Sequence, residues 1–171
     1  PIDQEGTYPL PEAQVDRFML KIKVGYPNKD EERKILDRMT ISQSQPKVDK
    51  VTNPEEIFAA RQMVDEVFVD EKVRNYIVDV VQATRVESGQ NPAEVEGMIE
   101  YGASPRASIF LMQGAKGHAF LQGRNYITPH DVKTIAPDVL RHRIMLSYEA
   151  EAEGKSAEDI IQVILDSVLV P

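Results

Sequence analysis

The chain has 171 residues, of which 42% are hydrophobic and 28% are charged, a balance that supports one packed domain, or a small domain with part of another, and excludes wholesale disorder. It contains no cysteine, which excludes a disulfide framework, a thiol nucleophile and a thiolate metal site. The 20 basic and 28 acidic residues give a net charge of −8, which argues against nonspecific binding to nucleic acid or a membrane surface. No apolar run approaches the roughly 18 residues that span a bilayer, so we expect a soluble protein.

The first residues predict a loop, a short helix and a strand. Residues 1–10 contain two prolines and a glycine and are expected to form an extended loop. Residues 11–16 are predicted to form one or two helical turns, with the proline at the first position. Residues 18–24 alternate apolar and basic side chains in their second half, which is typical of a β-strand. A lone strand leaves its edge groups unpaired, so this strand needs a partner that the rest of the sequence does not obviously provide.

The remainder of the chain predicts mainly helices. In each case a capping residue precedes a proline or an acidic residue and an apolar stripe of helical period. In all, we expect five or six helices, one strand near the start and a small hairpin. Residues 42–46 are predicted to be a linker and residues 87–103 a long connection, and Pro137 is expected to kink or end its helix. The predicted capping residues are Asn28, Asn53, Asp70, Ser104, Thr128 and Ser156.

The charge is unevenly distributed along the chain. Residues 87–103 carry four acids and no base, residues 147–171 carry six acids and one base, and residues 104–146 carry six bases and two acids. Arg106 falls in the first turn of a predicted helix, where a cation opposes the helix dipole by roughly 0.3–1 kcal/mol. A phosphate held by its guanidinium and by free helix amide groups would explain this residue. A surface ion pair with an acid such as Glu100 explains it equally well.

Arg17 is the second unusual arginine, because it lies at the turn from the short helix into the predicted strand. On spacing alone, an exposed pair with Asp16 or Glu12 is favoured, and such a pair contributes only about 0–1 kcal/mol. The spacing therefore assigns no function to Arg17 by itself.

Longer motifs show a family resemblance. Residues 4–18, QEGTYPLPEAQVDRF, resemble the segment that follows sensor 1 in MoxR-family AAA+ ATPases, and residues 102–107, GASPRA, resemble the sensor 2 motif of that family. Residues 123–132 and 139–143 resemble the later part of its helical lid. The resemblance covers the whole chain and implies a mainly α fold: an AAA+ C-terminal helical lid domain with a short α/β remnant, one orphan strand, at the N-terminus.

The resemblance also implies three parts. Residues 1–27 would be the tail of a nucleotide-binding α/β domain, residues 28–46 a connecting helix and linker, and residues 47–171 the helical lid with sensor 2. The sequence contains no G-x-x-x-x-G-K-[ST] and no apolar strand that ends in paired acids, so neither a Walker A nor a Walker B motif is evident. We therefore expect a C-terminal fragment that begins just after sensor 1 and that does not hydrolyse ATP alone.

The site roles follow from the same resemblance. Arg17 matches the arginine finger, which acts in trans on ATP bound to the neighbouring subunit. Arg106 matches the sensor 2 arginine, which contacts the phosphates of ATP bound to its own subunit, and Ser104 caps the helix beside that site. The resemblance implies ATP and Mg²⁺ as cofactors of the complete protein, neither held tightly by this chain alone, and no metal ligand in this chain.

The implied partners are further copies of the protein, in a hexameric ring, and a von Willebrand factor A-domain protein or another client. The implied activity is chaperone-like remodelling or maturation of partner complexes, including metal insertion, in the cytoplasm. We expect neither a membrane nor nucleic acid as a partner.

Two readings from other classes stay open. The helices predicted over residues 104–122 and 129–141, with six bases in that region, would also suit a protein-docking module or a DNA-binding helix-turn-helix without ATPase activity, although the net charge disfavours DNA. A metalloprotein using His118, His130 and His142 is less consistent with the sequence. Twelve-residue spacings place no two of these histidines in adjacent helical turns, which disfavours shared metal binding.

Overall fold

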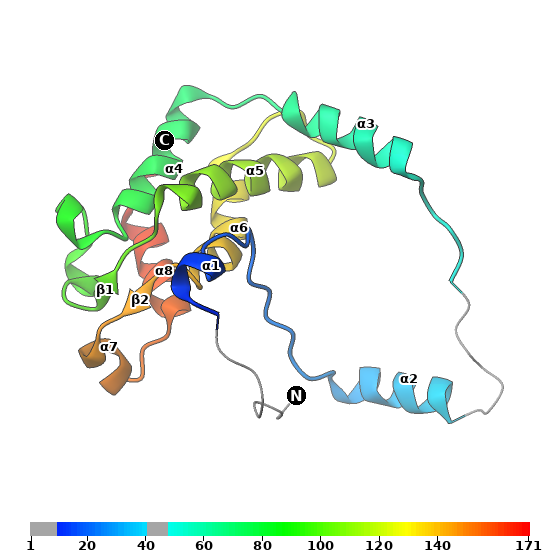
Figure 1. Cartoon of the computed structure of the whole chain (residues 1–171), viewed down its shortest axis with the longest axis horizontal. Coiled ribbons are helices and arrows are strands. Elements are labelled where there is room, and N and C mark those ends of the chain that lie inside the picture. Colours follow the sequence, from blue (N-terminus) through cyan, green and yellow to red (C-terminus); the bar gives the residue numbers. More distant parts are fainter. Residues whose placement is uncertain (1–9, 41–47) are drawn as a thin grey trace. The chain divides into compact units, whose positions relative to one another are not determined.

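The computed structural model describes residues 10–40 and 48–171 (Figure 1). The loop predicted for residues 1–10 lies almost entirely outside the described residues, and the linker predicted for residues 42–46 lies fully outside them. The chain divides into two compact units, of which one is residues 22–61 and the other joins the residues up to Lys21 to residues 62–171.

The smaller unit contains α2 (Lys29–Met39) and most of α3 (Pro54–Asp65). Asn28 begins α2 with a capping box, in which its side chain accepts the Glu31 amide at 3.0 Å and the Glu31 carboxylate accepts the Asn28 amide at 2.8 Å. The predicted start of this helix is therefore confirmed. No residue of α2 is buried, so local capping rather than packing defines this helix within its unit.

The larger unit begins with α1 (Glu12–Val15), which confirms the short helix predicted there. The strand predicted over residues 18–24 is wrong, because that backbone forms no regular element. A strand needs a neighbouring strand to pair its backbone groups, and no strand among the described residues lies along it. Instead, the Lys21 amide donates to the Asp138 carbonyl at 2.9 Å, so the segment bonds to a helix end.

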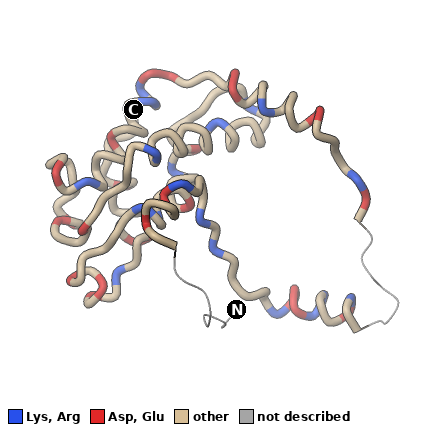
Figure 2. Tube along the Cα trace, viewed as in Figure 1, with Lys and Arg blue, Asp and Glu red and all other residues tan. Residues whose placement is uncertain are grey.

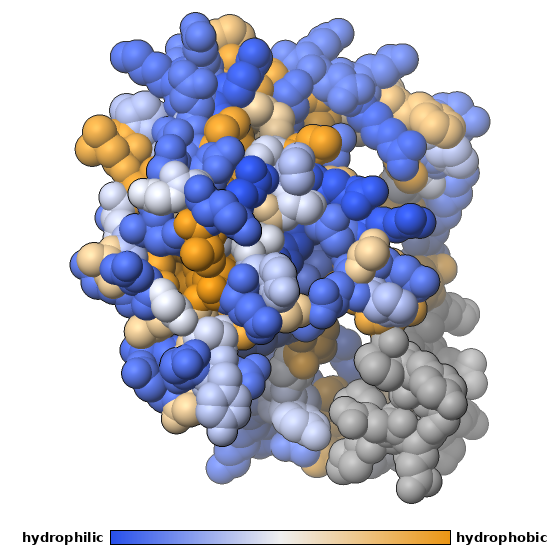
Figure 3. Space-filling model, turned by 60° about the vertical axis from the view of Figure 1, so that its left-hand side comes forward, coloured by the Kyte–Doolittle hydropathy of each residue, from blue (hydrophilic) through white to orange (hydrophobic). Residues whose placement is uncertain are grey.

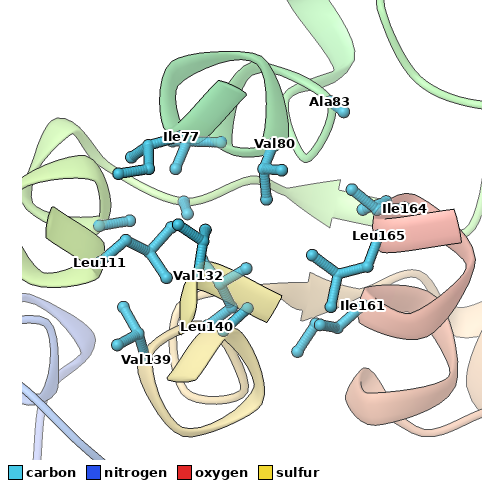
Figure 4. Close-up of a cluster of buried hydrophobic side chains, with 14 of the residues drawn as sticks. Ile77, Val80, Ala83, Leu111, Val132, Val139, Leu140, Ile161, Ile164 and Leu165 are labelled. Atoms are coloured by element: carbon cyan, nitrogen blue, oxygen red, sulfur yellow. The ribbon is translucent and has the colours of Figure 1, made fainter. Parts of the chain in front are cut away.

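Four helices build the core of the larger unit: α4 (Glu71–Gln82), α5 (Pro105–Leu121), α6 (Pro129–Leu140) and α8 (Ala157–Ser167). Their apolar stripes meet in one buried cluster (Figure 4), as the helical periodicity predicted. The mainly α fold class is thereby confirmed. The cluster includes Ile77, Val80, Leu111, Val132, Val139, Leu140, Ile161, Ile164 and Leu165.

Small side chains allow α5 and α6 to approach closely. Ala107, Ala115 and Ala119 are fully buried along α5, and a Cβ atom added at Gly114 would lie 2.6 Å from Cγ2 of Ile135 on α6. Pro137 lies inside α6, which continues to Leu140, so the proline does not end the helix.

The connection between α4 and α5 is more structured than the sequence indicated. It contains two 3₁₀ turns, η1 (Val86–Ser88) and η2 (Ala93–Val95), and then β1 (Ile99–Tyr101). This strand pairs antiparallel with β2 (Met145–Leu146), which is followed by the short helix α7 (Tyr148–Ala152). The sheet therefore joins two distant segments and not the arms of a hairpin.

The face drawn in Figure 3 is mostly hydrophilic, with small groups of hydrophobic side chains between the hydrophilic ones. None of the helices in the described part of the chain has the length and hydropathy needed to cross a bilayer.

Candidate functional site

The end of α4 fixes the start of α5. Gly102 lies so close to α4 that an added Cβ atom would be 2.2 Å from the carbonyl oxygen of Thr84. The Thr84 hydroxyl accepts the Ala103 amide at 3.0 Å, and Nε of Arg85 donates to the Ala103 carbonyl at 2.8 Å. These contacts hold Ser104, the capping residue of α5, at a defined position.

The first amide groups of α5 are already in use. Pro105 has no N–H group, the Arg106 amide donates to Oγ of Ser104 at 3.3 Å, and the Ala107 amide donates to the Ser104 carbonyl at 2.9 Å. The side chain of Arg106, rather than the helix amides, is therefore the group at this helix end that is suited to bind an anion.

An internal anion already lies at this helix end. Oγ of Ser104 is 2.9 and 3.0 Å from the two carboxylate oxygens of Asp16, and Nη1 of Arg106 is 3.0 Å from one of them. Arg143 bonds the other oxygen through Nε at 3.0 Å. Burial raises the pKa of Asp16, but the hydrogen bonds from Arg106 and Ser104 and the charge of Arg143 outweigh it, so this pKa lies below its ordinary value.

The two arginines that hold Asp16 differ in burial. The Arg106 side chain is 50% exposed, whereas the Arg143 side chain is 1% exposed. Burial lowers the pKa of Arg143, and the charge of Asp16 opposes this effect. The Arg143 guanidinium also lies over the ring of Phe110, 4.9 Å from its centre, an arrangement that favours a cation. In Figure 2, basic and acidic segments of the trace lie close together around α1.

Arg17 follows Asp16 directly and is exposed. Its amide donates to the Gln14 carbonyl at 3.1 Å, and no ion pair of its side chain is found within the described ranges. The surface pairs that spacing favoured, with Asp16 or Glu12, are not among the ion pairs of the described residues. The partner of Arg106 is Asp16, 90 positions away, and not Glu100.

The structure thus brings Ser104 and Arg106 together with the residue next to Arg17. Sequence reasoning missed the two residues that make this contact, Asp16 and Arg143. Both lie inside motifs that carry the family resemblance, but only the fold shows that they touch.

A cavity of about 380 Å³ borders the same cluster. Asp16, Ser104, Arg143 and His142 line it together with residues of β1 and β2. Nε2 of His142 is 3.0 Å from the Phe18 carbonyl, its Nδ1 atom has no hydrogen-bond partner, and burial lowers the pKa of this histidine. The cavity therefore combines charged and neutral polar groups.

A second polar cluster is structural. Asp131, in the first turn of α6, is fully buried and binds Arg124 through both oxygens. Nδ1 of His118 lies 2.6 Å from the same carboxylate, and the Thr128 hydroxyl donates to it at 2.8 Å. Burial alone would raise the pKa of Asp131, but the Arg124 and His118 hydrogen bonds hold it far below its ordinary value.

The three histidines of the chain lie in different surroundings. His118 belongs to the Asp131 cluster, His142 borders the Asp16 cluster, and His130 is exposed at the start of α6. Within residues 10–40 and 48–171, no three or more His, Cys, Asp or Glu side chains are grouped as a metal ion would require.

Comparison with known protein families identifies the class of domain to which this helical unit is similar. The family described as the AAA lid domain matches residues 92–164, the part that runs from the connection after α4 into α8. The packing of α5, α6 and α8 is therefore that of an AAA lid.

Similarity over the whole chain narrows the family. The chain is 41% identical to Chaperone MoxR1 of Mycobacterium tuberculosis, over 100% of this chain and 45% of MoxR1. It is 40% identical to the uncharacterized protein YeaC of Bacillus subtilis, over 100% of this chain and 51% of YeaC. A crystal structure of a presumptive ATPase from Cytophaga hutchinsonii matches it with a TM-score of 0.92 and 42% identity, over 100% of this chain and 52% of that chain.

The chain is a MoxR-family AAA+ C-terminal region. It spans about half the length of the curated relatives that it matches. The family resemblance found in the sequence is thus confirmed, whereas the roles of Arg17, Arg106 and Ser104 stay predictions.

Proposed function

We propose that this chain supplies the arginine finger and the sensor 2 arginine of an AAA+ ATPase whose nucleotide-binding part lies outside it. ATP hydrolysis by the complete protein would drive remodelling or maturation of partner protein complexes, including metal insertion. The name of the relative MoxR1, a chaperone, supports such work on a client. A von Willebrand factor A-domain protein is the client class that we propose, and the cytoplasm is the proposed compartment.

The observation that carries this proposal is the state of Arg106. Its guanidinium lies at the start of α5, is half exposed, and pairs with one carboxylate, Asp16. An ion pair with this much exposure contributes only about 0–1 kcal/mol. A phosphate group offers two acceptor oxygens to the same planar guanidinium and binds it more strongly. Arg106 is therefore suited to exchange an internal carboxylate for a phosphate of ATP.

The exposure of Arg17 supports a role outside its own subunit. An arginine supplied by a neighbouring subunit stabilises charge on the transferring γ-phosphoryl group and raises the rate by about 10³–10⁵-fold. Such a finger requires contact between adjacent copies, which a closed ring provides for every subunit. We therefore propose a homo-oligomer, with six subunits as in the ring that the family resemblance implies.

ATP and Mg²⁺ belong to this proposal as ligands of the complete protein. The described residues do not fit a magnesium site, because they hold no group of three potential metal ligands. The chain alone is therefore proposed to be inactive, with Arg106 contributing one contact to the ATP phosphates and Ser104 holding that helix end in place.

A chimaera tests these roles. This chain would replace the matching half of the Cytophaga hutchinsonii protein, and ATP hydrolysis would be measured. Arg17→Ala should lower kcat by about 10³-fold or more. Arg106→Ala should raise KM for ATP by roughly tenfold to a hundredfold, as expected for a lost hydrogen bond to a charged group. Arg74→Ala, which removes an exposed arginine on α4, is the matched control.

Mixing of subunits tests the action in trans. Arg17→Ala subunits would be mixed with subunits that lack the Walker A lysine of the nucleotide-binding part. Activity should recover in the mixture, because an intact site then meets an intact finger across a shared interface. Equal activity of the parent chimaera and both arginine variants would contradict the proposed function.

A further inference from the structure

Arg143 makes an unusually complete set of contacts with the segment that contains Arg17. Its Nε atom donates to the Asp16 carboxylate at 3.0 Å, and Nη2 donates to the carbonyls of Asp16 at 2.8 Å and Phe18 at 2.6 Å. Nη1 donates to the carbonyl of Met19 at 3.3 Å and to that of Val139 at the end of α6. All five N–H donors of a guanidinium are thus directed to acceptors.

These acceptors bracket Arg17 without touching its side chain. The carbonyls of Asp16, Phe18 and Met19 lie on either side of it, whereas Arg17 itself stays exposed. The guanidinium therefore defines the backbone around Arg17 and leaves its side chain open to a neighbouring molecule.

The segment has little regular structure of its own to hold its shape, although Ser104 and Arg106 also bond the Asp16 carboxylate and His142 also contacts the Phe18 carbonyl. The helix before it, α1, is four residues long and has no buried residue, and an isolated helix of this length is unstable in water. The amides of Asp16, Arg17 and Phe18 donate back into α1, so these bonds persist only while the segment is held against the lid. Arg143 is almost fully buried under Phe110 and is the central group that holds it.

We infer that Arg143 is a positioning residue for the arginine finger: its guanidinium fixes the backbone on both sides of Arg17 to the lid end of α6. This inference rests on the proposed function of Arg17. The inference adds that the arginine finger moves together with the lid, because Arg143 and Arg106 hold the same Asp16 side chain. A lid movement that follows nucleotide binding through Arg106 would then move the finger offered to the next subunit.

Hydrogen exchange on the intact 171-residue chain tests the clamp, by which we mean the hydrogen bonds from Arg143 to residues 16–19. In Arg143→Lys the positive charge remains, but an ammonium group has only three donors and no planar fork. The amides of residues 16–18 should exchange roughly tenfold faster or more, while the amides of α8 keep their rates. Arg124→Lys is the matched control, since Arg124 binds Asp131 and none of the residues 16–19.

A second variant covers the case in which Arg143→Lys fails to fold. Asp16→Asn leaves the carbonyl contacts of Arg143 in place and removes the ion pairs of Asp16 with Arg143 and Arg106, so it should raise the same exchange rates as well. Unchanged rates at residues 16–18 in both variants, or equal increases in Arg124→Lys, would overturn the clamp.

Kinetics of the chimaera separate positioning from general stability. Arg143→Lys should lower kcat by roughly tenfold or more with little change in KM for ATP, whereas Arg124→Lys should leave kcat unchanged. Faster exchange with an unchanged kcat would overturn the positioning role. If Arg17→Ala itself leaves kcat unchanged, the proposed function fails, and the exchange result shows separately whether the clamp exists.

Discussion

Replacing Asp16 by asparagine removes the negative charge that faces Arg106 and Arg143 while it keeps the shape of the side chain. Arg143 is 1% exposed, and it would lose its one described acidic partner. Leaving a buried charge unpaired costs about 3–5 kcal/mol. Because backbone carbonyls still surround the guanidinium, we expect a loss near about 3 kcal/mol in the free energy of unfolding. The half-exposed Arg106 pair adds about 0–1 kcal/mol.

The same charge gives the effect a defined pH dependence. The folded chain holds the pKa of Asp16 below its ordinary value, so the stability that ionised Asp16 contributes is complete above the ordinary pKa. It is lost as the pH falls through the lowered pKa. The difference between the parent chain and Asp16→Asn should therefore be full near about pH 7 and shrink below about pH 4.

Urea unfolding followed by circular dichroism would measure this difference at about pH 7, 5 and 3. Asp79→Asn is the matched control, because Asp79 is exposed on α4 and should change stability by less than about 0.5 kcal/mol. The reasoning is refuted if Asp16→Asn matches the control at neutral pH, or if its deficit stays constant down to about pH 3.

Three further predictions concern single side chains. Gly102→Ala should lower the free energy of unfolding by about 1–3 kcal/mol, because its Cβ atom would lie 2.2 Å from the Thr84 carbonyl oxygen; an unchanged melting temperature would contradict this. Asp131→Ala should lower the free energy of unfolding in urea by about 1–3 kcal/mol, since the Thr128 amide and hydroxyl lose a buried acceptor, and a loss below about 0.5 kcal/mol would argue against the cluster. Arg17→Ala should leave urea unfolding unchanged within about 0.5 kcal/mol, because the side chain is exposed; a larger loss would indicate a structural role.

Helix starts could be predicted because their signals are local. The capping boxes at Asn28 and Ser156 satisfy backbone donors within three residues, so the sequence alone defines them. For the strand predicted at residues 18–24, no local sequence signal decides whether a strand forms. Its alternation was real, but strand formation depends on a partner that periodicity does not reveal. The pairing of β1 with β2 was missed for the same reason, since Ile99 pairs with Leu146.

In the candidate site, too, the local features could be predicted from the sequence and the long-range contacts could not. Ser104 and Arg106 could be placed at a helix start from the Ser-Pro pattern alone. Their contact with Asp16 spans about 90 positions and that of Arg143 spans 127, so neither could be read from spacing. The amide groups expected to hold a phosphate were also misjudged, because the proline and the capping bonds leave the guanidinium as the suitable donor.

Under the proposed function, the different burial of Arg106 and Arg143 would let one carboxylate, that of Asp16, contribute to both stability and nucleotide binding. The Arg106 side chain is half exposed and its pair with Asp16 contributes little to stability, so the proposed binding of a phosphate by Arg106 would not unfold the unit. In the Asp16–Arg143 pair the arginine side chain is almost fully buried, and breaking the pair would leave a buried charge without its partner. Asp16 is therefore expected to stay on Arg143 when Arg106 leaves. The segment that bears Arg17 would then stay attached to the lid in both nucleotide states, which is the condition for passing a signal from one subunit's ATP site to the next.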